Sequence, residues 1–289
     1  MSAYRFCRSD DIDLLVDALN RCWSPYVPDQ PPLTTAAFKR SIRDLQVWCS
    51  SCMVAFSGAD PIGVLIGAKR PSGTLVHTIA VHPDHLRQGH GRHLLASLGS
   101  KLAILGPPRI IAEVPETLAP ARELFTAAGY VQEAVLTDYV LTVEENSSTR
   151  DRDAGDGGHF VIPVTVDDLA ANGLLGETTP PPCWQRSVET LRARKEEVAG
   201  LAVASDEQIE ACVLYIEGTD TTEIVSLQAF VQDGGTRLRQ LLSRLSANGR
   251  RSFHISKLHP AETSKELLET LGFSSAGGHL LYAAQARSG

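Results

Sequence analysis

Residues 75–95 read Leu75-Val-His-Thr-Ile-Ala-Val-His-Pro-Asp-His-Leu-Arg-Gln-Gly-His-Gly-Arg-His-Leu-Leu95. The part up to Val81 is rich in β-branched side chains, which is typical of a strand. A Gly-x-Gly turn follows at Gly89 and Gly91, and residues 92–105 then have the leucine-rich pattern of a helix. Glycines leave backbone N–H groups unshielded where the helix begins, and the helix dipole favours an anion there. The segment therefore predicts a strand, a turn and a helix that together form a pocket for phosphate oxygens.

Two cations flank the turn and strengthen this interpretation. Arg87 and Arg92 can add charge-assisted hydrogen bonds to a phosphate. A Gly-x-Gly pattern alone is also typical of a tight turn that binds nothing. Leu94 stands where a Gly-x-Gly-x-x-Gly motif has its third glycine, and the turn lacks the Gly-Lys-Ser/Thr of a P-loop. The sequence thus excludes two common nucleotide motifs at this turn and leaves the phosphate site open.

The same order of elements runs through the chain twice. Each half predicts a strand, two helices, three strands, a helix, a strand, a helix and a final strand. Each half also closes its last helix with a glycine and an aromatic residue, at Gly129-Tyr130 and Gly272-Phe273. The polar, glycine-rich residues 144–158 read as an exposed linker. We therefore expect an α+β fold with domains at residues 1–143 and 159–289, each a mixed, mostly antiparallel sheet flanked by helices.

The composition narrows the classes of function. The 289 residues suit two domains, and the 43% hydrophobic and 21% charged residues are ordinary for a globular protein. No run approaches the ~18 apolar residues that span a bilayer, and the start of the chain has no apolar signal-peptide core. The net charge of −7 argues against a broad basic surface, so we expect neither a membrane nor a nucleic-acid partner. Six cysteines without a disulfide framework fit a reducing, cytoplasmic setting.

Residues 3–143 resemble the GNAT N-acetyltransferase superfamily. The resemblance is sharpest at Ile79-Ala-Val-His-Pro83, at Arg87-Gln-Gly-His-Gly-Arg92 and at Phe125-Thr-Ala-Ala-Gly-Tyr130. It implies that the turn amides bind the pyrophosphate of acetyl-CoA while pantetheine lies along the end of the preceding strand. The acetyl-CoA-binding residues implied in this way are Ile79, Ala80, Val81, Arg87, Gln88, Gly89, His90, Gly91, Arg92 and His93.

Three positions depart from the family's pattern. Leu86 replaces a usual Gln or Arg, and Leu118 replaces an Asn that often faces the cofactor. Phe125 stands where a Tyr often protonates the departing thiolate, so the general acid is unassigned. The segment Trp23-Ser-Pro-Tyr-Val-Pro28 follows the first helix, where the family often places a substrate-binding loop. A Trp23 that simply faces the core is the alternative there.

The implied reaction needs a base, because an alkylamine with a pKa near ~10.4 is mostly protonated at neutral pH. The resemblance aligns His77 with a Glu that often serves as this base, and an imidazole suits the task. Glu113, on the next strand, is the second candidate. In a regular strand residues 77, 79 and 81 share one face, which places His77 beside the cofactor. A structural histidine and a solvated carboxylate are the alternatives.

Histidines are unusually dense around the turn, at positions 77, 82, 85, 90 and 93. A metal site needs converging ligands. Two of these histidines bracket Pro83 in a loop, a third lies inside the glycine turn, and no cysteine is nearby in the sequence. We therefore expect no metal.

The second half resembles a degenerate GNAT domain. Residues 223–229 mirror the cofactor strand, but the turn at 230–237 lacks Gly-x-Gly, and Asp233 brings negative charge where a pyrophosphate would lie. A structural partner that shapes the substrate cleft is the implied role. Together the resemblances imply an acetyl-CoA-dependent N-acyltransferase that moves an acetyl group to a primary amine by direct attack. The acceptor is a small-molecule amine or a peptide N-terminus, and the protein is a monomer or homodimer; the alternative is a non-catalytic acyl-CoA-binding or sensor protein.

Overall fold

The computed structural model describes residues 2–143, 160–176 and 180–287. The predicted linker, 144–158, lies outside the described residues. Contacts divide the chain into two compact units. The first unit comprises the chain up to Ala134 and again from Leu280 onward, and the second unit comprises Val135–His279. Among the described residues, no helix has the length and apolar character needed to cross a membrane.

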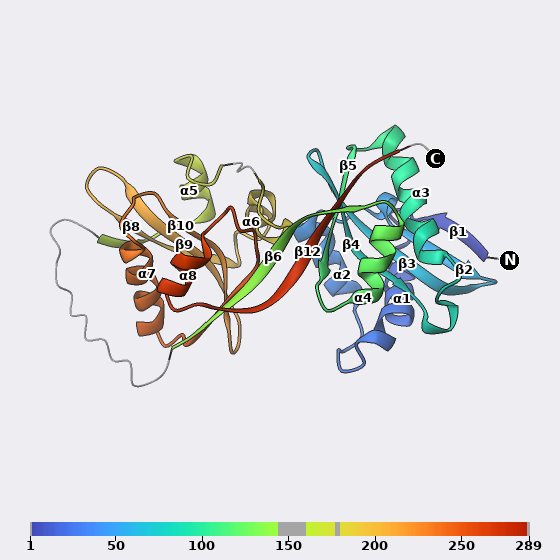
Figure 1. Cartoon of the computed structure of the whole chain (residues 1–289), viewed down its shortest axis with the longest axis horizontal. Helices are drawn as coiled ribbons and strands as arrows, with labels where there is room; N and C mark the ends of the chain where they lie inside the picture. Colours follow the sequence, from blue (N-terminus) through green and yellow to red (C-terminus); the bar gives the residue numbers. More distant parts are fainter. Residues whose placement is uncertain (1, 144–159, 177–179, 288–289) are drawn as a thin grey trace. The chain divides into compact units, whose positions relative to one another are not determined.

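The first unit is built on one sheet (Figure 1). Its strands follow the order β1-β2-β3-β4-β5-β12, with antiparallel pairing from β1 to β4 and parallel pairing between β4 and β5. The strands are β1 (Ser2–Phe6), β2 (Met53–Ser57), β3 (Asp60–Arg70), β4 (Gly73–Val81), β5 (Arg109–Pro115) and the end of β12 (Ser274–Gln285). The helices are α1 (Ile12–Trp23), η1 (Ser24–Tyr26), α2 (Thr35–Leu45), η2 (Cys49–Ser51), η3 (Pro83–His85), α3 (His90–Leu105) and α4 (Ala119–Ala127).

Helices cover both faces of this sheet, because neighbouring positions of a strand point to opposite sides. Leu65 of β3 and its partner Ile79 of β4 pack with α3 and α4. The next pair along, Ile66 and Thr78, lines a pocket with residues of α1 and α2. The α1–α2 face and the α3–α4 face are therefore separate environments on the two sides of β4.

The second unit repeats this plan. Its strands follow the order β6-β11-β10-β9-β8-β7, with β10 and β11 as the parallel pair. The strands are β6 (Val131–Thr142), β7 (Phe160–Pro163), β8 (Val198–Ala204), β9 (Ile209–Glu217), β10 (Thr222–Ala229) and β11 (Ser252–Leu258). The helices are α5 (Val166–Ala171), η4 (Trp184–Arg186), α6 (Val188–Ala193), α7 (Thr236–Ala247) and α8 (Lys265–Thr270). The predicted α+β class with mixed, mostly antiparallel sheets is confirmed.

Each unit takes its last strand from the other half of the sequence. Residues 280–285 of β12 lie beside β5, and the Ala286 N–H donates to the Pro108 carbonyl at 2.6 Å. Residues 135–142 of β6 pair with β11 in the second unit. The sequence division at 1–143 and 159–289 follows chain order and does not anticipate this exchange. The partner of each final strand lies far away in the sequence, so the local pattern contains no signal for the choice.

Candidate functional site

The centre of the site is the free end of β4. β4 and β5 pair only at Thr74–Ile110 and Leu75–Ile111 in the described chain, and beyond these positions the two strands separate. The His82 N–H donates to the Ile62 carbonyl of β3 at 2.9 Å. Because antiparallel residues alternate in the direction of their hydrogen bonds, the backbone groups of Ile79 and Val81 point away from β3. They point toward the gap next to β5, as an edge that can bond an extended ligand.

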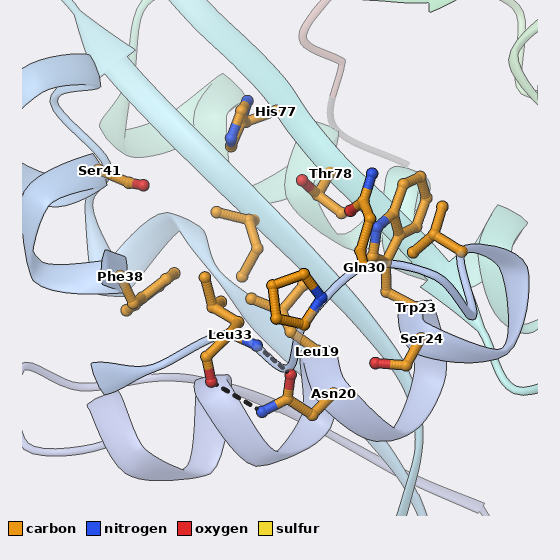
Figure 2. A pocket seen from close by; sticks show the side chains of 13 residues that line it. Leu19, Asn20, Trp23, Ser24, Gln30, Leu33, Phe38, Ser41, His77 and Thr78 are labelled. Carbon is orange, nitrogen blue, oxygen red and sulfur yellow. Dashed lines mark hydrogen bonds between the residues drawn. The ribbon is translucent and has the colours of Figure 1, made fainter. Parts of the chain in front are cut away.

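His77 is the extra residue of a β-bulge. The register runs from Ile66↔Thr78 directly to Gly67↔Val76, so that His77 has no partner position on β3. His77 and Thr78 consequently line the same pocket on the α1–α2 face (Figure 2). Ile79 packs on the opposite face. The expectation that 77, 79 and 81 share one face is therefore wrong, since it assumed a regular strand.

The pocket has a volume of about 200 Å³ and lies between β4, α1, α2 and the segment that joins these helices. Asn20 forms two hydrogen bonds with Leu33 of this segment. Its side-chain N–H donates to the Leu33 carbonyl at 2.9 Å, and its side-chain oxygen accepts from the Leu33 N–H at 2.7 Å (Figure 2). The lining consists of Leu19, Asn20, Trp23, Ser24, Val27, Gln30, Pro31, Leu33, Phe38, Ser41, Ile66, His77 and Thr78.

A second contact ties the same segment to the end of β4. The Tyr26 hydroxyl donates to the Val81 carbonyl at 2.6 Å. Burial raises the pKa of Tyr26. Sequence reasoning placed Tyr26 in a possible substrate loop but did not foresee this bond. The position of this segment directly after the first helix indicated a substrate-binding loop. That position does not indicate which backbone atom the Tyr26 hydroxyl bonds.

The two glycines of the turn have different tasks. Gly89 caps α3 in the left-handed region at φ +87°, and an added Cβ there would meet no atom within 4 Å. Gly91 is buried, and a Cβ would lie 3.0 Å from the Leu124 side chain of α4. Gly89 therefore shapes an open turn at the helix N-terminus, whereas Gly91 allows close packing of α3 on α4.

The cationic residues of the turn lie on the surface. Arg87 adopts φ +61° and forms an exposed ion pair with Glu123 at 3.2 Å. Gln88 donates to the Asp84 carbonyl at 3.4 Å. Arg92 is exposed on the first turn of α3. These residues flank Gly89 in the chain, and their exposed cationic side chains beside a helix N-terminus suit an anion.

His90 lies inside the fold, as Gly91 does, whereas the other predicted residues of the turn are exposed. It is 5% exposed, and its Nδ1 lies 2.6 Å from the Tyr4 hydroxyl of β1. Its Nε2 has no hydrogen-bond partner in the described part of the chain. Burial lowers the pKa of His90, and the neighbouring His85 and His93 lower it further. The Tyr4 ring also lies over His93, with centroids 3.8 Å apart. Within residues 2–143, 160–176 and 180–287, no group of three His, Cys, Asp or Glu could hold a metal ion.

Glu113, the second predicted base, and Phe125, at the position where the family often has the acid, lie on opposite sides of the sheet. Glu113 alternates with the buried Ala112 and Val114, which pack on the α3–α4 face, so it points to the α1–α2 side like His77 but does not line the pocket. Phe125 is 2% exposed in the core, where it meets Tyr130 edge-on at 5.1 Å and stacks on Tyr282 at 5.9 Å. Burial also raises the pKa of Tyr130. Phe125 is thus a packing residue.

The second unit contains the same turn with its amides already engaged. Gly235 caps α7 at φ +84°, as Gly89 caps α3. The Asp233 carboxylate accepts from the Gly235 N–H at 2.9 Å and from the Arg237 N–H at 2.7 Å. An internal carboxylate therefore occupies the place where an anion would bind.

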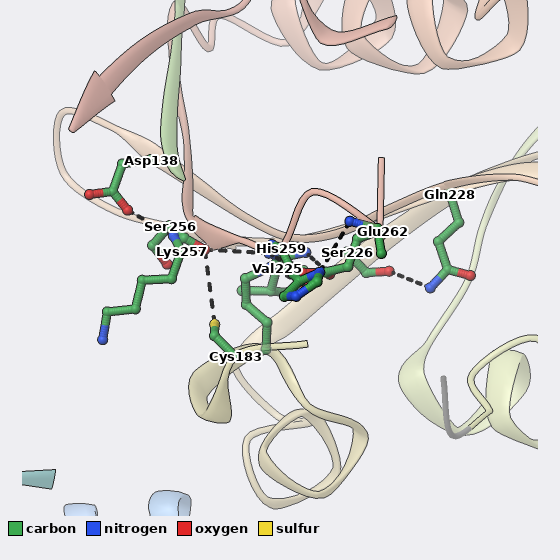
Figure 3. Close-up of polar contacts among 11 residues, drawn as sticks. Asp138, Cys183, Val225, Ser226, Gln228, Ser256, Lys257, His259 and Glu262 are labelled. Atoms are coloured by element: carbon green, nitrogen blue, oxygen red, sulfur yellow. Dashed lines mark hydrogen bonds and ion pairs between the residues drawn. The ribbon is translucent and has the colours of Figure 1, made fainter. Parts of the chain in front are cut away.

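β10 and β11 pair only at Thr222–Phe253 and Glu223–His254 in the described chain, which leaves a gap between the two strands beyond these positions. The side chain of Arg186 fills this gap. Arg186 is 6% exposed and donates to the Val225 and Ser256 carbonyls, both at 3.4 Å. It is neutralised by Glu262 at 2.6 Å, and Figure 3 shows Val225, Ser256 and Glu262 in this region. The strand edge that is open in the first unit is closed here by a buried ion pair.

The comparisons with known proteins agree with this picture. Residues 12–130 match the acetyltransferase (GNAT) family. No curated protein compared with the chain matches it. A tandem GNAT protein from the clavulanic acid biosynthesis pathway has a TM-score of 0.68 at 15% identity, with 99% of each chain covered. A GCN5-related N-acetyltransferase from Sphaerobacter thermophilus has a TM-score of 0.65 at 14% identity, covering 100% of this chain and 96% of that one.

At these identities the structural likenesses show the fold, and they extend over both units. The family match falls on the unit that has the open turn and the separated strands. Residues 12–130 are therefore a domain of the acetyltransferase (GNAT) family, in a chain that has the tandem GNAT fold.

Proposed function

We propose that the first unit is an acetyl-CoA-dependent N-acetyltransferase that acetylates a primary amine by direct attack. Acyl-CoA-dependent acetyl transfer is the general chemistry of the family that residues 12–130 match. One observation carries the proposal. The open turn and the free strand edge lie at one end of β4, while the bulge of the same strand presents His77 to a pocket on the α1–α2 face.

The residues of the first unit fit acetyl-CoA, which supplies an activated acetyl group when bound. Gly89 leaves an open cradle of amides at the N-terminus of α3, flanked by exposed Arg87 and Arg92. These groups suit the negative charge of a pyrophosphate. The backbone groups of Ile79 and Val81 suit the amides of a pantetheine arm, although the Val81 carbonyl already accepts from Tyr26. Gln88 and His93 complete the proposed cofactor residues, with His90 and Gly91 shaping the turn from inside. The backbone groups of Ala80, by the same alternation, point to β3, so Ala80 supports the strand edge between Ile79 and Val81.

On the acceptor side, His77 takes the proton from the ammonium group, directly or through one water. Glu113 is the second candidate for this base, from the same side of the sheet. Backbone N–H groups near Val81 donate to the carbonyl oxygen that gains charge. We propose that the second unit has a structural role. Each chain then has one acetyl-CoA site, and the protein is a monomer or homodimer. The six cysteines all lie in the described residues and form no disulfide there, which supports a reducing, cytoplasmic setting.

A non-catalytic acyl-CoA-binding or sensor protein is the second candidate. The identity of Phe125 favours it, because this side chain has no hydroxyl to protonate a thiolate. The deciding experiment is release of free coenzyme A from acetyl-CoA by the full chain, measured with and without a panel of amines. Amine-dependent release supports the transferase. Binding of acetyl-CoA without amine-dependent release supports the sensor.

A further inference from the structure

The acceptor pocket is built almost without charge. Its lining contains no Asp, Glu, Lys or Arg from the described residues, and His77 is its one titratable side chain. Aromatic and aliphatic walls come from Trp23, Phe38, Leu19 and Ile66. Two of the charged side chains of α1 are engaged outside the pocket: Arg21 pairs with Asp60 at 2.8 Å, and Asp13 accepts from Thr35 at 3.0 Å.

The pocket is also preformed and small. Asn20 braces Leu33, and Tyr26 anchors the same segment to Val81, so the wall opposite β4 is fixed at two points. Its volume of about 200 Å³ is below the ~300–1,000 Å³ of pockets for drug-sized ligands. A site of this size accepts one compact group and has little room for the hydration shell of a second charge.

We propose, resting on the proposed function, that the acceptor is a monoamine whose remaining body is uncharged and apolar or aromatic. The body lies against Trp23 and Phe38, and the amine lies at His77 and Thr78. A carboxylate or a second ammonium on the acceptor would meet hydroxyl and amide groups but no side chain of opposite charge in the described lining, and burial of a charge without such a partner is unfavourable. Amino acids and diamines are therefore poor acceptors, and arylalkylamines and branched alkylamines are good ones.

Two matched pairs of amines test this with the full chain. 2-Phenylethylamine and phenylalanine differ by one carboxylate, and pentylamine and 1,5-diaminopentane differ by one ammonium. We expect kcat/KM for acetylation to be at least tenfold higher for 2-phenylethylamine than for phenylalanine, and at least tenfold higher for pentylamine than for 1,5-diaminopentane. Equal or higher values for the charged members would overturn the acceptor class while leaving the transferase intact.

A pair of variants provides the reverse test. Ser41 lines the pocket from α2, and its hydroxyl contacts only the Ala37 carbonyl among the contacts of this side chain that the structure records, at 3.4 Å. Ser41→Asp places a carboxylate in the pocket, and Ser41→Asn is the neutral control of similar size. We expect Ser41→Asp to raise the preference for 1,5-diaminopentane over pentylamine at least tenfold relative to Ser41→Asn. No difference between the two variants would contradict the assignment of the pocket.

Calorimetric titration of the same four amines, with coenzyme A present, separates the two proposals. If no amine is acetylated, the transferase assignment fails. Tighter binding of 2-phenylethylamine than of phenylalanine would still uphold the acceptor class. Absence of binding by 2-phenylethylamine and pentylamine would overturn it.

Discussion

At the scale of single residues, His77 shows how one inserted position changes the chemistry of a strand. The bulge turns His77 and Thr78 to the same pocket, while Val76 and Ile79 both pack on the other face. A base at this position can reach an amine in the pocket without leaving the strand. The assignment of His77 therefore depends on the irregularity.

We expect His77→Ala to lower acetyl transfer about 10²–10⁴-fold at neutral pH, which is the usual contribution of a positioned acid–base group. Affinity for coenzyme A should stay unchanged, because the imidazole lies on the acceptor side. The loss should shrink as pH approaches ~10.4, where more of the amine is already neutral. Glu113→Gln is the control. Near-native turnover of His77→Ala with the chemical step rate-limiting, combined with a large loss in Glu113→Gln, would transfer the role to Glu113.

Gly89 offers a sharper test of the phosphate site than Gly91, whose replacement would disturb the packing against Leu124. Asp and Asn tolerate the left-handed region better than most residues do. Gly89→Asp adds negative charge beside the open amides, and Gly89→Asn adds the same volume without charge. We expect calorimetry to show coenzyme A binding at least tenfold weaker in Gly89→Asp than in Gly89→Asn. Equal affinities would place the pyrophosphate elsewhere.

His90 predicts a pH dependence of stability. Burial holds the pKa of His90 below its ordinary 6.5, so the unfolded chain binds this proton more readily than the folded chain. The stabilisation is complete above about pH 6.5 and is lost as pH falls through the folded value. We expect urea unfolding at pH 7.5 and 5.5 to show a smaller loss in His90→Gln than in the unaltered chain. An identical loss of unfolding free energy in both proteins would show that other titratable groups cause the pH dependence.

At the scale of elements, the same glycine turn precedes two helices but differs in its backbone amides. They are open to a ligand at one helix and bonded by a side chain of the protein at the other. α3 leaves its first amides open beside Gly89, whereas Asp233 bonds those of α7 from within. A carboxylate at a helix N-terminus is a stabilising cap. The charge that makes the second turn unsuitable for a pyrophosphate therefore also stabilises that unit.

We expect Asp233→Asn to lower the free energy of unfolding by about 0.3–1 kcal/mol, because Asn lacks the negative charge at the helix N-terminus and one of the two accepting oxygens. Asp220→Asn, at an exposed turn of the same unit, is the control. Coenzyme A should still titrate to a stoichiometry near one, because Arg186 continues to fill the gap between β10 and β11. A second binding event in Asp233→Asn would show that the carboxylate alone had closed the site.

Local sequence patterns predicted most of the helices and strands. The predicted strand at 75–81 lies within β4, and the predicted helix at 92–105 is α3, which begins two residues earlier because Gly89 is its cap. β-branched runs and glycine turns are local signals, so they identify such elements directly. The bulge at His77 and the Tyr26–Val81 bond depend on partners distant in sequence, and no local pattern encodes them.

At the scale of the whole molecule, the exchanged strands decide which fragments can work alone. Leu280 and Tyr282 belong to the core of the first unit, and Tyr282 stacks on Phe125. A fragment of residues 1–146 lacks both side chains and leaves β5 without its neighbour. Sequence repeats correctly indicated two similar folds, but they could not indicate which final strand completes which sheet.

We expect the fragment of residues 1–146 to be less stable and less active than the full chain. Addition of a peptide of residues 274–289 should restore part of the activity, whereas the same peptide with Tyr282→Ala should restore less. Thermal unfolding and acetyl transfer measure the two effects. A fragment that unfolds and turns over like the full chain, without peptide, would contradict this view.

The exchanged strand also bears on how the protein is made. A ribosome releases the chain from its N-terminus, and domains are usually able to fold in that order during synthesis. Here the sheet that begins first receives residues 280–285 only after the whole second unit, Val135–His279, has been synthesised. Until then the edge of the nascent sheet at β5 lacks its neighbour, so the first unit is completed only after the chain of the second unit has been made. A ribosome stalled shortly before those codons would hold an acetyltransferase domain that has every proposed site residue but an unfinished sheet.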